Sequence, residues 1–344
     1  MPILKTDLTR VPDLKDHASG TGPLRSRLPL YKDFLPPCNH ACPAGENIQA
    51  WLSLAQNGQY KQAWDKLVEE NPMPSIHGRV CYHPCENDCN RTYIDSPVNI
   101  HAVERYLGDL ADQNDWQFPK PVKASGKKVL VIGAGPCGLS AAYQLARLGD
   151  QVEVYEAGPV AGGMMNFGIP AYRLPRNVLQ AEIKRIENLE VKIKLNYKVS
   201  DVQDEKKRGH FDAVFLAIGA QIGKKTDIPA REAGKILDAV TFLKDVELGI
   251  KPHLGRRVAI YGGGNTAMDA ARIAMRLGAD ETLIIYRRDR EHMPAHEFEA
   301  DEAMSEGIKI HWLRTIKNMD ASSITVERMD IRDGNLFLPV HSKH

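Results

Sequence analysis

Residues 128–138 read KVLVIGAGPCG, and this stretch decides the fold. A short apolar run ends in a glycine-rich turn, and an alanine-rich run at helical spacing follows it. The same order recurs at residues 257–267, which read RVAIYGGGNTA. A strand, a glycine turn and a helix open a nucleotide-binding βαβ unit, so the repeat predicts two doubly wound, Rossmann-like domains.

The first glycine turn has the spacing of a dinucleotide site. Gly133 permits a tight turn, Gly135 lets a pyrophosphate approach the backbone, and Gly138 lets the helix pack closely on the strand. The helix N-terminus adds backbone donors and a favourable dipole for the same anion. Glu156 follows the next predicted strand, where a carboxylate can accept hydrogen bonds from the ribose hydroxyls of FAD or NAD. A purely structural turn with a solvated glutamate is the alternative.

The second glycine turn ends differently. Its following strand runs into Tyr286, Arg287 and Arg288 instead of an acidic residue. Two guanidinium groups at the ribose position can pair with a 2′-phosphate, which favours NADPH over NADH, whereas the alternative is a basic surface run. The residues predicted to bind NADPH are Gly262, Gly264, Asn265, Thr266, Ala267, Arg287 and Arg288.

The bulk composition is that of an ordinary globular protein. The chain has 344 residues, 43% of them hydrophobic and 26% charged, with a net charge of +1. This charge gives no reason to expect nucleic acid or an anionic membrane as a partner. No apolar run reaches the roughly 20 residues of a membrane span, and prolines and charges interrupt the first thirty residues, so we expect a cytoplasmic protein.

Upstream of the first turn, the pattern changes from alternating strands and helices to helices alone. Apolar residues at helical spacing predict helices over residues 47–56, 59–70 and 99–113. A cysteine-rich loop is expected from Gly78 to Arg91, and prolines indicate a linker over 115–126. The expected domains are 1–126, with an arm, a helical domain and a linker, then the nucleotide-binding domains 127–224 and 225–344.

The six cysteines are unevenly distributed. Five lie between Cys38 and Cys89 with the spacings CxxxC and CxxxCxxxC, and the sixth is Cys137 in the first glycine turn. Thiols clustered in this way in a chain without secretory features indicate metal or cluster ligands more often than disulfides. We interpret Cys137 as a packing residue. Because no cysteine follows it, the nucleotide-binding units lack the pair of cysteines that a redox-active disulfide needs.

Several longer runs resemble one family, the glutamate synthase small subunit. PPCNHACPAGENIQAW, GRVCYHPCENDCNR and PVNIHAVERYLGD are similar to its N-terminal iron–sulfur domain, a type also found in dihydropyrimidine dehydrogenase. GAGPCGLSAA, AGGMMNFGIPAYRLP, FLAIGA, GGGNTAMDAAR and YRRDREHMPA are similar to its flavin and NADPH segments and follow in the same order. The resemblance covers roughly residues 36–310.

The resemblance implies an electron relay. NADPH would reduce FAD, and electrons would pass through a [4Fe-4S] cluster to a partner subunit. The family's flavin-side residues match Gly162, Gly163, Gly168, Ile169, Pro170 and Gly219. Since hydride moves directly between stacked rings, we assign no catalytic acid or base.

The resemblance also implies a set of cluster ligands. One cluster's positions match Cys42, Cys81 and Cys85, with Glu104 where that cluster has a non-cysteine ligand. Cys38 and Cys89 match the other cluster, which lacks its remaining ligands here, so a single cluster is expected. A structural zinc site and reduced thiols in a helical core are the alternatives.

The remaining expectations concern the C-terminal part of the chain and the alternative functions. The family's C-terminal segment that returns to the flavin domain is not recognisable before His344. One alternative function is a reductase for a ferredoxin or another acceptor, which would use the same cofactors. The other, suggested by this missing segment, is a truncated, non-catalytic module that holds a cluster or docks to a complex. His292, Glu297 and Glu299 are interpreted as one solvated helix face rather than a metal site.

Overall fold

The structure, a computed structural model, describes residues 35–220, 236–320, 322–332 and 335–337. Of the predicted N-terminal arm, residues 1–35, only Leu35 is among these residues. No helix among the described residues is both long and apolar enough to cross a membrane.

The N-terminal region is helical, as expected. Asn47 caps the second helix by accepting a hydrogen bond from the Ala50 N–H, and the predicted helix 59–70 is regular only to Leu67. The elements are α1 (Pro37–Ala41), α2 (Ile48–Gln56), α3 (Tyr60–Leu67), α4 (Pro74–Val80), α5 (Pro84–Asn87), a 3₁₀ helix (Asn90–Tyr93) and α6 (Ile100–Gln113).

The helical core is built on aromatic side chains and on one close helix contact. Trp51 and Trp64 are fully buried, and α4 packs on α6. A Cβ on Gly78 would lie 2.4 Å from the Arg105 backbone nitrogen, and one on Gly108 would lie 2.4 Å from that of Ser75. Only glycine allows the two backbones to approach so closely.

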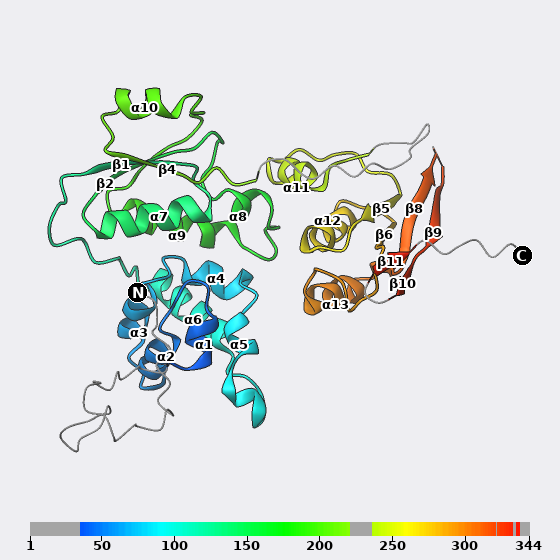
Figure 1. Cartoon of the computed structure of the whole chain (residues 1–344), viewed down its shortest axis with the longest axis horizontal. Coiled ribbons are helices and arrows are strands. Elements are labelled where there is room, and N and C mark those ends of the chain that lie inside the picture. Colours follow the sequence, from blue (N-terminus) through cyan, green and yellow to red (C-terminus); the bar gives the residue numbers. More distant parts are fainter. Residues whose placement is uncertain (1–34, 221–235, 321, 333–334, 338–344) are drawn as a thin grey trace, which may run out of the picture. The chain divides into compact units, whose positions relative to one another are not determined.

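The first nucleotide-binding unit is a four-stranded parallel sheet with the order β3-β2-β1-β4. Helices α7 and α9 lie on one face of this sheet and α10 on the other (Figure 1). The central strand β1 is buried, as expected for a parallel sheet covered on both faces. The elements are β1 (Lys128–Ile132), α7 (Pro136–Arg147), β2 (Gln151–Tyr155), α8 (Met164–Phe167), α9 (Arg176–Glu187), β3 (Lys192–Lys194), α10 (Val202–Arg208) and β4 (Ala213–Leu216).

The second nucleotide-binding unit repeats this pattern with a three-stranded parallel sheet of order β5-β6-β7. The first helix of this unit begins at Ala239, where the Asp238 side chain caps it by accepting a hydrogen bond from the Thr241 N–H. Two antiparallel hairpins, β8–β9 and β10–β11, follow. The elements are α11 (Ala239–Glu247), β5 (Arg257–Tyr261), α12 (Asn265–Arg276), β6 (Glu281–Ile285), α13 (Glu297–Ser305), β7 (Lys309–His311), β8 (Arg314–Met319), β9 (Ile324–Arg328), β10 (Asp330–Arg332) and β11 (Asn335–Phe337).

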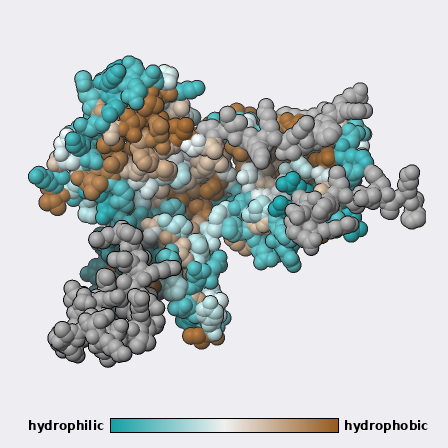
Figure 2. All heavy atoms as spheres, in the orientation of Figure 1, coloured by the Kyte–Doolittle hydropathy of each residue, from teal (hydrophilic) through white to brown (hydrophobic). Residues whose placement is uncertain are grey.

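The predicted fold class is confirmed: a helical region precedes two Rossmann-like units. Hydrophobic side chains gather on one face of the first unit (Figure 2). They are not confined to the core, because Phe215 and Leu216 of β4, the edge strand of the described sheet, are 40% and 58% exposed.

Candidate nucleotide-binding and cysteine-rich sites

Two glycines of the first turn are required by the chain's own packing. Gly133 has a φ of 105°, and a Cβ there would lie 2.3 Å from the Ala217 carbonyl oxygen. A Cβ on Gly138 would lie 1.9 Å from the Gly133 carbonyl oxygen. The strand, the turn and helix α7 therefore meet at distances that exclude any side chain.

The packing of the chain does not require glycine at the middle glycine position of either turn. Gly135 (φ −77°, ψ −177°) and Gly264 (φ −93°, ψ 172°) have backbone angles that any residue adopts. A Cβ on Gly135 would meet no atom closer than 3.9 Å, and one on Gly264 would meet none within 4 Å. Each glycine precedes a helix of 12 residues, whose N-terminus attracts an anion. The open space at both turns therefore fits a pyrophosphate that approaches the backbone.

Glu156 lies against the first turn, as its place after β2 predicts. Its Oε2 accepts a hydrogen bond from the Ala134 N–H (2.8 Å) and its Oε1 accepts one from the Gly158 N–H (2.7 Å). A carboxylate has further lone pairs, so both oxygens retain capacity for ribose hydroxyls.

The predicted flavin stretch is folded onto the same turn. The Gly162 N–H donates to the Ala134 carbonyl oxygen (2.8 Å). Gly163 has a φ of 52°, and its Cβ would lie 2.7 Å from the Gly135 Cα. Gly168, Ile169 and Pro170 lie between α8 and α9, and Gly219 follows β4 with a φ of 64°.

The second turn brings the predicted NADPH residues together at the ends of β5 and β6. Gly262 takes a φ of 153°, and its N–H donates to the Ile285 carbonyl oxygen (3.1 Å). Arg287 is exposed, whereas Arg288 is half-buried and its Nε has no hydrogen-bond partner among the described residues. An unpartnered guanidinium donor at this position fits the predicted 2′-phosphate.

Electrostatic interactions link the predicted ligands Cys42, Cys81, Cys85 and Glu104. Burial, followed by the nearby Cys42, Glu86 and Cys81, raises the pKa of Cys85 to about 12. Burial raises the pKa of Cys81, and the negative charge of Glu104 raises it further. All six cysteines are free thiols. Among the described residues, no three histidine, cysteine or acidic side chains are placed to hold a metal ion.

Cys38 and Cys89 are the remaining thiols of the cysteine-rich region. Burial raises the pKa of Cys38, and the neighbouring charge of Cys89 adds to this effect. Helix α5 and the 3₁₀ helix replace part of the predicted loop, because Pro84 can occupy the first turn of a helix.

A buried polar network, which the sequence does not reveal, holds Glu104. Asn71 Nδ2 donates to Glu104 Oε1 (2.7 Å) and to Glu46 Oε1 (2.9 Å), while Asn71 Oδ1 accepts from the Met73 N–H (2.9 Å) and lies 2.8 Å from His77 Nδ1. Burial raises the pKa of Glu46 to about 7 and that of Glu104 well above its ordinary value. Both carboxyl groups therefore favour a proton, or a cation that replaces it.

The cysteine-rich loop also contacts the second glycine turn. The Tyr82 ring stacks on the His296 ring with centroids 3.7 Å apart, and Asn265 Nδ2 donates to the Tyr82 hydroxyl. The His296 N–H in turn donates to Asn265 Oδ1 (3.2 Å). A residue next to Cys81 thus lies against the first residue of α12.

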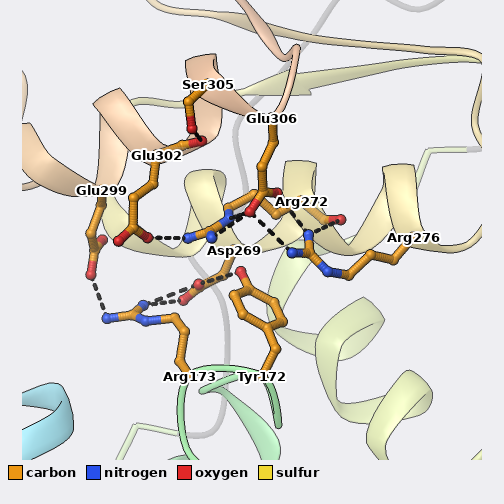
Figure 3. Close-up of polar contacts among 9 residues, drawn as sticks. All are labelled: Tyr172, Arg173, Asp269, Arg272, Arg276, Glu299, Glu302, Ser305 and Glu306. Carbon is orange, nitrogen blue, oxygen red and sulfur yellow. Dashed lines mark hydrogen bonds and ion pairs between the residues drawn. The ribbon is translucent and has the colours of Figure 1, made fainter.

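One interpretation of the sequence is wrong. Glu299 is 1% exposed and pairs with Arg173, rather than lying on a solvated face (Figure 3). The reason is that α13 turns this position towards α12 and the loop that carries Arg173, a contact between segments far apart in sequence. His292 and Glu297 do have exposed side chains, at 40% and 80%.

Two parts of the chain match known protein families. Residues 127–338 match the pyridine nucleotide-disulphide oxidoreductase family. Residues 33–116 match a second family, described as dihydropyrimidine dehydrogenase domain II, 4Fe-4S cluster. The predicted cofactor classes agree with both matches.

Curated relatives confirm the resemblance to the glutamate synthase small chain. The small chain of NADPH glutamate synthase from Escherichia coli (strain K12) is 35% identical over 289 residues, which cover 80% of this chain and 61% of that protein. The NADP(+)-dependent formate dehydrogenase subunit beta of Moorella thermoacetica is 40% identical over 310 residues, which cover 82% of this chain and 44% of that protein. The chain thus spans about half the length of these relatives.

Solved structures share the fold at lower identity. FprA from Mycobacterium tuberculosis in complex with NADPH superposes with a TM-score of 0.53 at 17% identity, covering 63% of this chain and 67% of that one. Taken with the two glycine turns and the match over residues 127–338, the chain belongs to the pyridine nucleotide-disulphide oxidoreductase family.

Proposed function

We propose that this chain is an oxidoreductase subunit that passes electrons from NADPH through FAD to an iron–sulfur cluster and then to a partner protein. The observation that carries the proposal is the open space at Gly135 and Gly264, each directly ahead of a helix N-terminus. Two such spaces in one chain suit two dinucleotides. Bound FAD would accept a hydride from NADPH and release electrons one at a time.

The chain's own residues would bind and orient these groups. Gly133, Gly135, Gly138 and Glu156 would hold the FAD pyrophosphate and ribose, with the Gly162–Pro170 segment beside the flavin and Gly219 at the end of β4. The second turn, from Gly262 to Ala267, would bind NADPH, with Arg287 and Arg288 on its 2′-phosphate.

Cys42, Cys81, Cys85 and Glu104 would hold the cluster, with Cys38 or Cys89 as a substitute thiolate. The donor types fit an iron–sulfur cluster because thiolates are its usual ligands. Burial disfavours the anionic forms of these side chains, which is why their pKa values are raised. The positive charge of a bound metal centre would stabilise those anionic forms.

The partner is an electron acceptor. The similar proteins include a formate dehydrogenase subunit and a glutamate synthase small chain, so related chains serve different complexes. A ferredoxin-like acceptor is the second candidate, because small iron–sulfur proteins accept single electrons.

Anaerobic purification tests the function directly. We expect the protein to carry flavin, iron and acid-labile sulfide, and NADPH to bleach the flavin absorbance faster than NADH does. A protein with iron but no flavin, even after incubation with FAD, would instead be the non-catalytic module. Binding of neither FAD nor NADPH would refute the proposal.

The coenzyme preference has its own test, the double substitution Arg287→Ala and Arg288→Ala. If both guanidinium groups bind the 2′-phosphate, NADP⁺ affinity should fall about 100-fold while NAD⁺ affinity changes little, since each such charged hydrogen bond contributes about 1.5 kcal/mol or more. Equilibrium titration with each nucleotide measures both affinities. Arg257→Ala is the matched control, because Arg257 pairs with Glu281 and begins β5, at the end away from the glycine turn. An unchanged ratio of the two affinities would contradict the assignment.

A further inference from the structure

The loop between α8 and α9 carries an arginine that reaches into the second nucleotide-binding unit. Arg173 Nη1 lies 2.8 Å from Asp269 Oδ2 and 3.0 Å from Oδ1, and Arg173 Nη2 donates to Glu299 Oε1 (Figure 3). Asp269 belongs to α12 and Glu299 to α13. One side chain of the flavin-side loop thus binds two helices of the NADPH unit.

These three charges are withdrawn from water. The Arg173 side chain is 13% exposed, that of Asp269 7% and that of Glu299 2%. Two carboxylates share one guanidinium, and Glu299 Oε2 is buried without a hydrogen-bond partner among the described residues. Burying charged groups costs free energy, and an incomplete pairing offsets little of that cost. The cluster therefore contributes little to the stability of the fold, but it fixes the relative position of the loop and the two helices.

Further contacts fix the same loop. Arg176 Nη2 donates to the Ile169 carbonyl oxygen (2.7 Å) and pairs with Glu247 of α11 (2.8 Å). Tyr172 lies under two guanidinium groups of α12, with the Arg272 and Arg276 centres 4.7 Å and 4.1 Å from its ring centroid. The loop that contains the end of the predicted flavin stretch is therefore bound to α11, α12 and α13.

We propose that Arg173 is a positioning residue for hydride transfer, which sets the flavin-side loop against the NADPH unit through Asp269 and Glu299. The inference rests on the proposed function. Helix α12 begins at the second glycine turn, so a shift of the loop against α12 is a shift of the flavin against the nicotinamide. Hydride transfer needs reacting atoms about 3–3.5 Å apart, and a misplacement of about 1 Å can cost roughly 100-fold in rate.

Substitution of Arg173 tests this role in the complete, FAD-loaded protein. Arg173→Ala should lower the limiting rate of flavin reduction at saturating NADPH by about 100-fold, with FAD content unchanged and NADP⁺ affinity altered only a few-fold. Arg173→Lys keeps a cation that can reach one carboxylate and should recover part of the rate. Anaerobic stopped-flow absorbance gives the rate, and equilibrium titration gives the affinity.

A second set of variants keeps the test decisive if Arg173→Ala folds poorly. Asp269→Asn with Glu299→Gln removes the partner charges and should slow flavin reduction similarly, and adding Arg173→Ala to that pair should have little further effect. Arg208→Ala is the matched control, because Arg208 pairs with Glu205 within the first unit. Its limiting rate should equal that of the unsubstituted protein.

The outcomes separate the two proposals. If the unsubstituted protein shows no flavin reduction by NADPH, the proposed function fails and the role of Arg173 fails with it. If the unsubstituted protein is reduced but Arg173→Ala has the same limiting rate, only the positioning role is refuted. Loss of FAD from both Arg173→Ala and Arg173→Lys would also refute it, because the residue would then serve binding.

Discussion

Gly135→Val is expected to weaken FAD binding strongly while leaving the fold of the protein intact. The backbone at Gly135 adopts angles that valine also adopts, and the nearest atom to a Cβ is 3.9 Å away. The isopropyl group would occupy the space ahead of α7 and prevent the pyrophosphate from reaching the helix N-terminus. Affinity should fall at least about 100-fold, since the backbone donors of the site become inaccessible. Flavin fluorescence with the apoprotein measures binding, and thermal unfolding measures the fold.

Gly264→Val is the matched control, because it makes the same change in the second turn, where the space is equally open. This variant should keep FAD and lose NADP⁺ affinity. If Gly135→Val retained full FAD affinity, the first turn would not be the flavin site. If both variants lost both nucleotides, the two turns would not be separate sites.

Gly138→Ala, unlike Gly135→Val, should destabilise the fold itself. The added Cβ would lie 1.9 Å from the Gly133 carbonyl oxygen, which is backbone and cannot rotate away. Strand β1 and helix α7 would have to separate, at a cost of about 3 kcal/mol or more in the free energy of unfolding. Denaturant titration of the apoprotein followed by circular dichroism measures this cost. Gly135→Ala is the control, because it adds the same methyl group three residues earlier in open space. It should lower the free energy of unfolding by at most about 1 kcal/mol, the difference between glycine and alanine as a helix N-cap.

Equal stability of these two alanine variants would contradict the packing derived for the turn. A loss of stability confined to Gly138→Ala would show that the glycines of one motif have different tasks. In that case Gly138 serves the fold, and Gly135 serves the ligand.

The two nucleotide-binding units could be predicted from sequence because their signals are local. A strand, a glycine turn and the start of a helix lie within about a dozen consecutive residues in each unit, as at 128–138 and 257–267. The helices of the cysteine-rich region were harder to predict because prolines there suggest breaks. Pro74 and Pro84 instead occupy the first turns of α4 and α5, where proline is tolerated.

The contacts across the chain could not be predicted, because nothing local encodes them. Arg173 and Glu299 are 126 positions apart, and the sequence of α13 alone resembles a solvated acidic helix. Asn71 and Glu104 are 33 positions apart, and an asparagine before a proline indicates only a helix end. The first contact depends on how the two nucleotide-binding units pack, and the second on how the helices of the N-terminal region pack.

The Asn71 network also determines which nitrogen of His77 carries hydrogen. The Met73 N–H can only donate, so the Asn71 atom that faces it must be the oxygen. That same oxygen lies 2.8 Å from His77 Nδ1, which must therefore donate as well, and the lone pair of the imidazole resides on Nε2. Burial lowers the pKa of His77 to about 4, so the ring stays neutral at physiological pH. Helix α4 consequently leads into Cys81 without an imidazolium charge at His77.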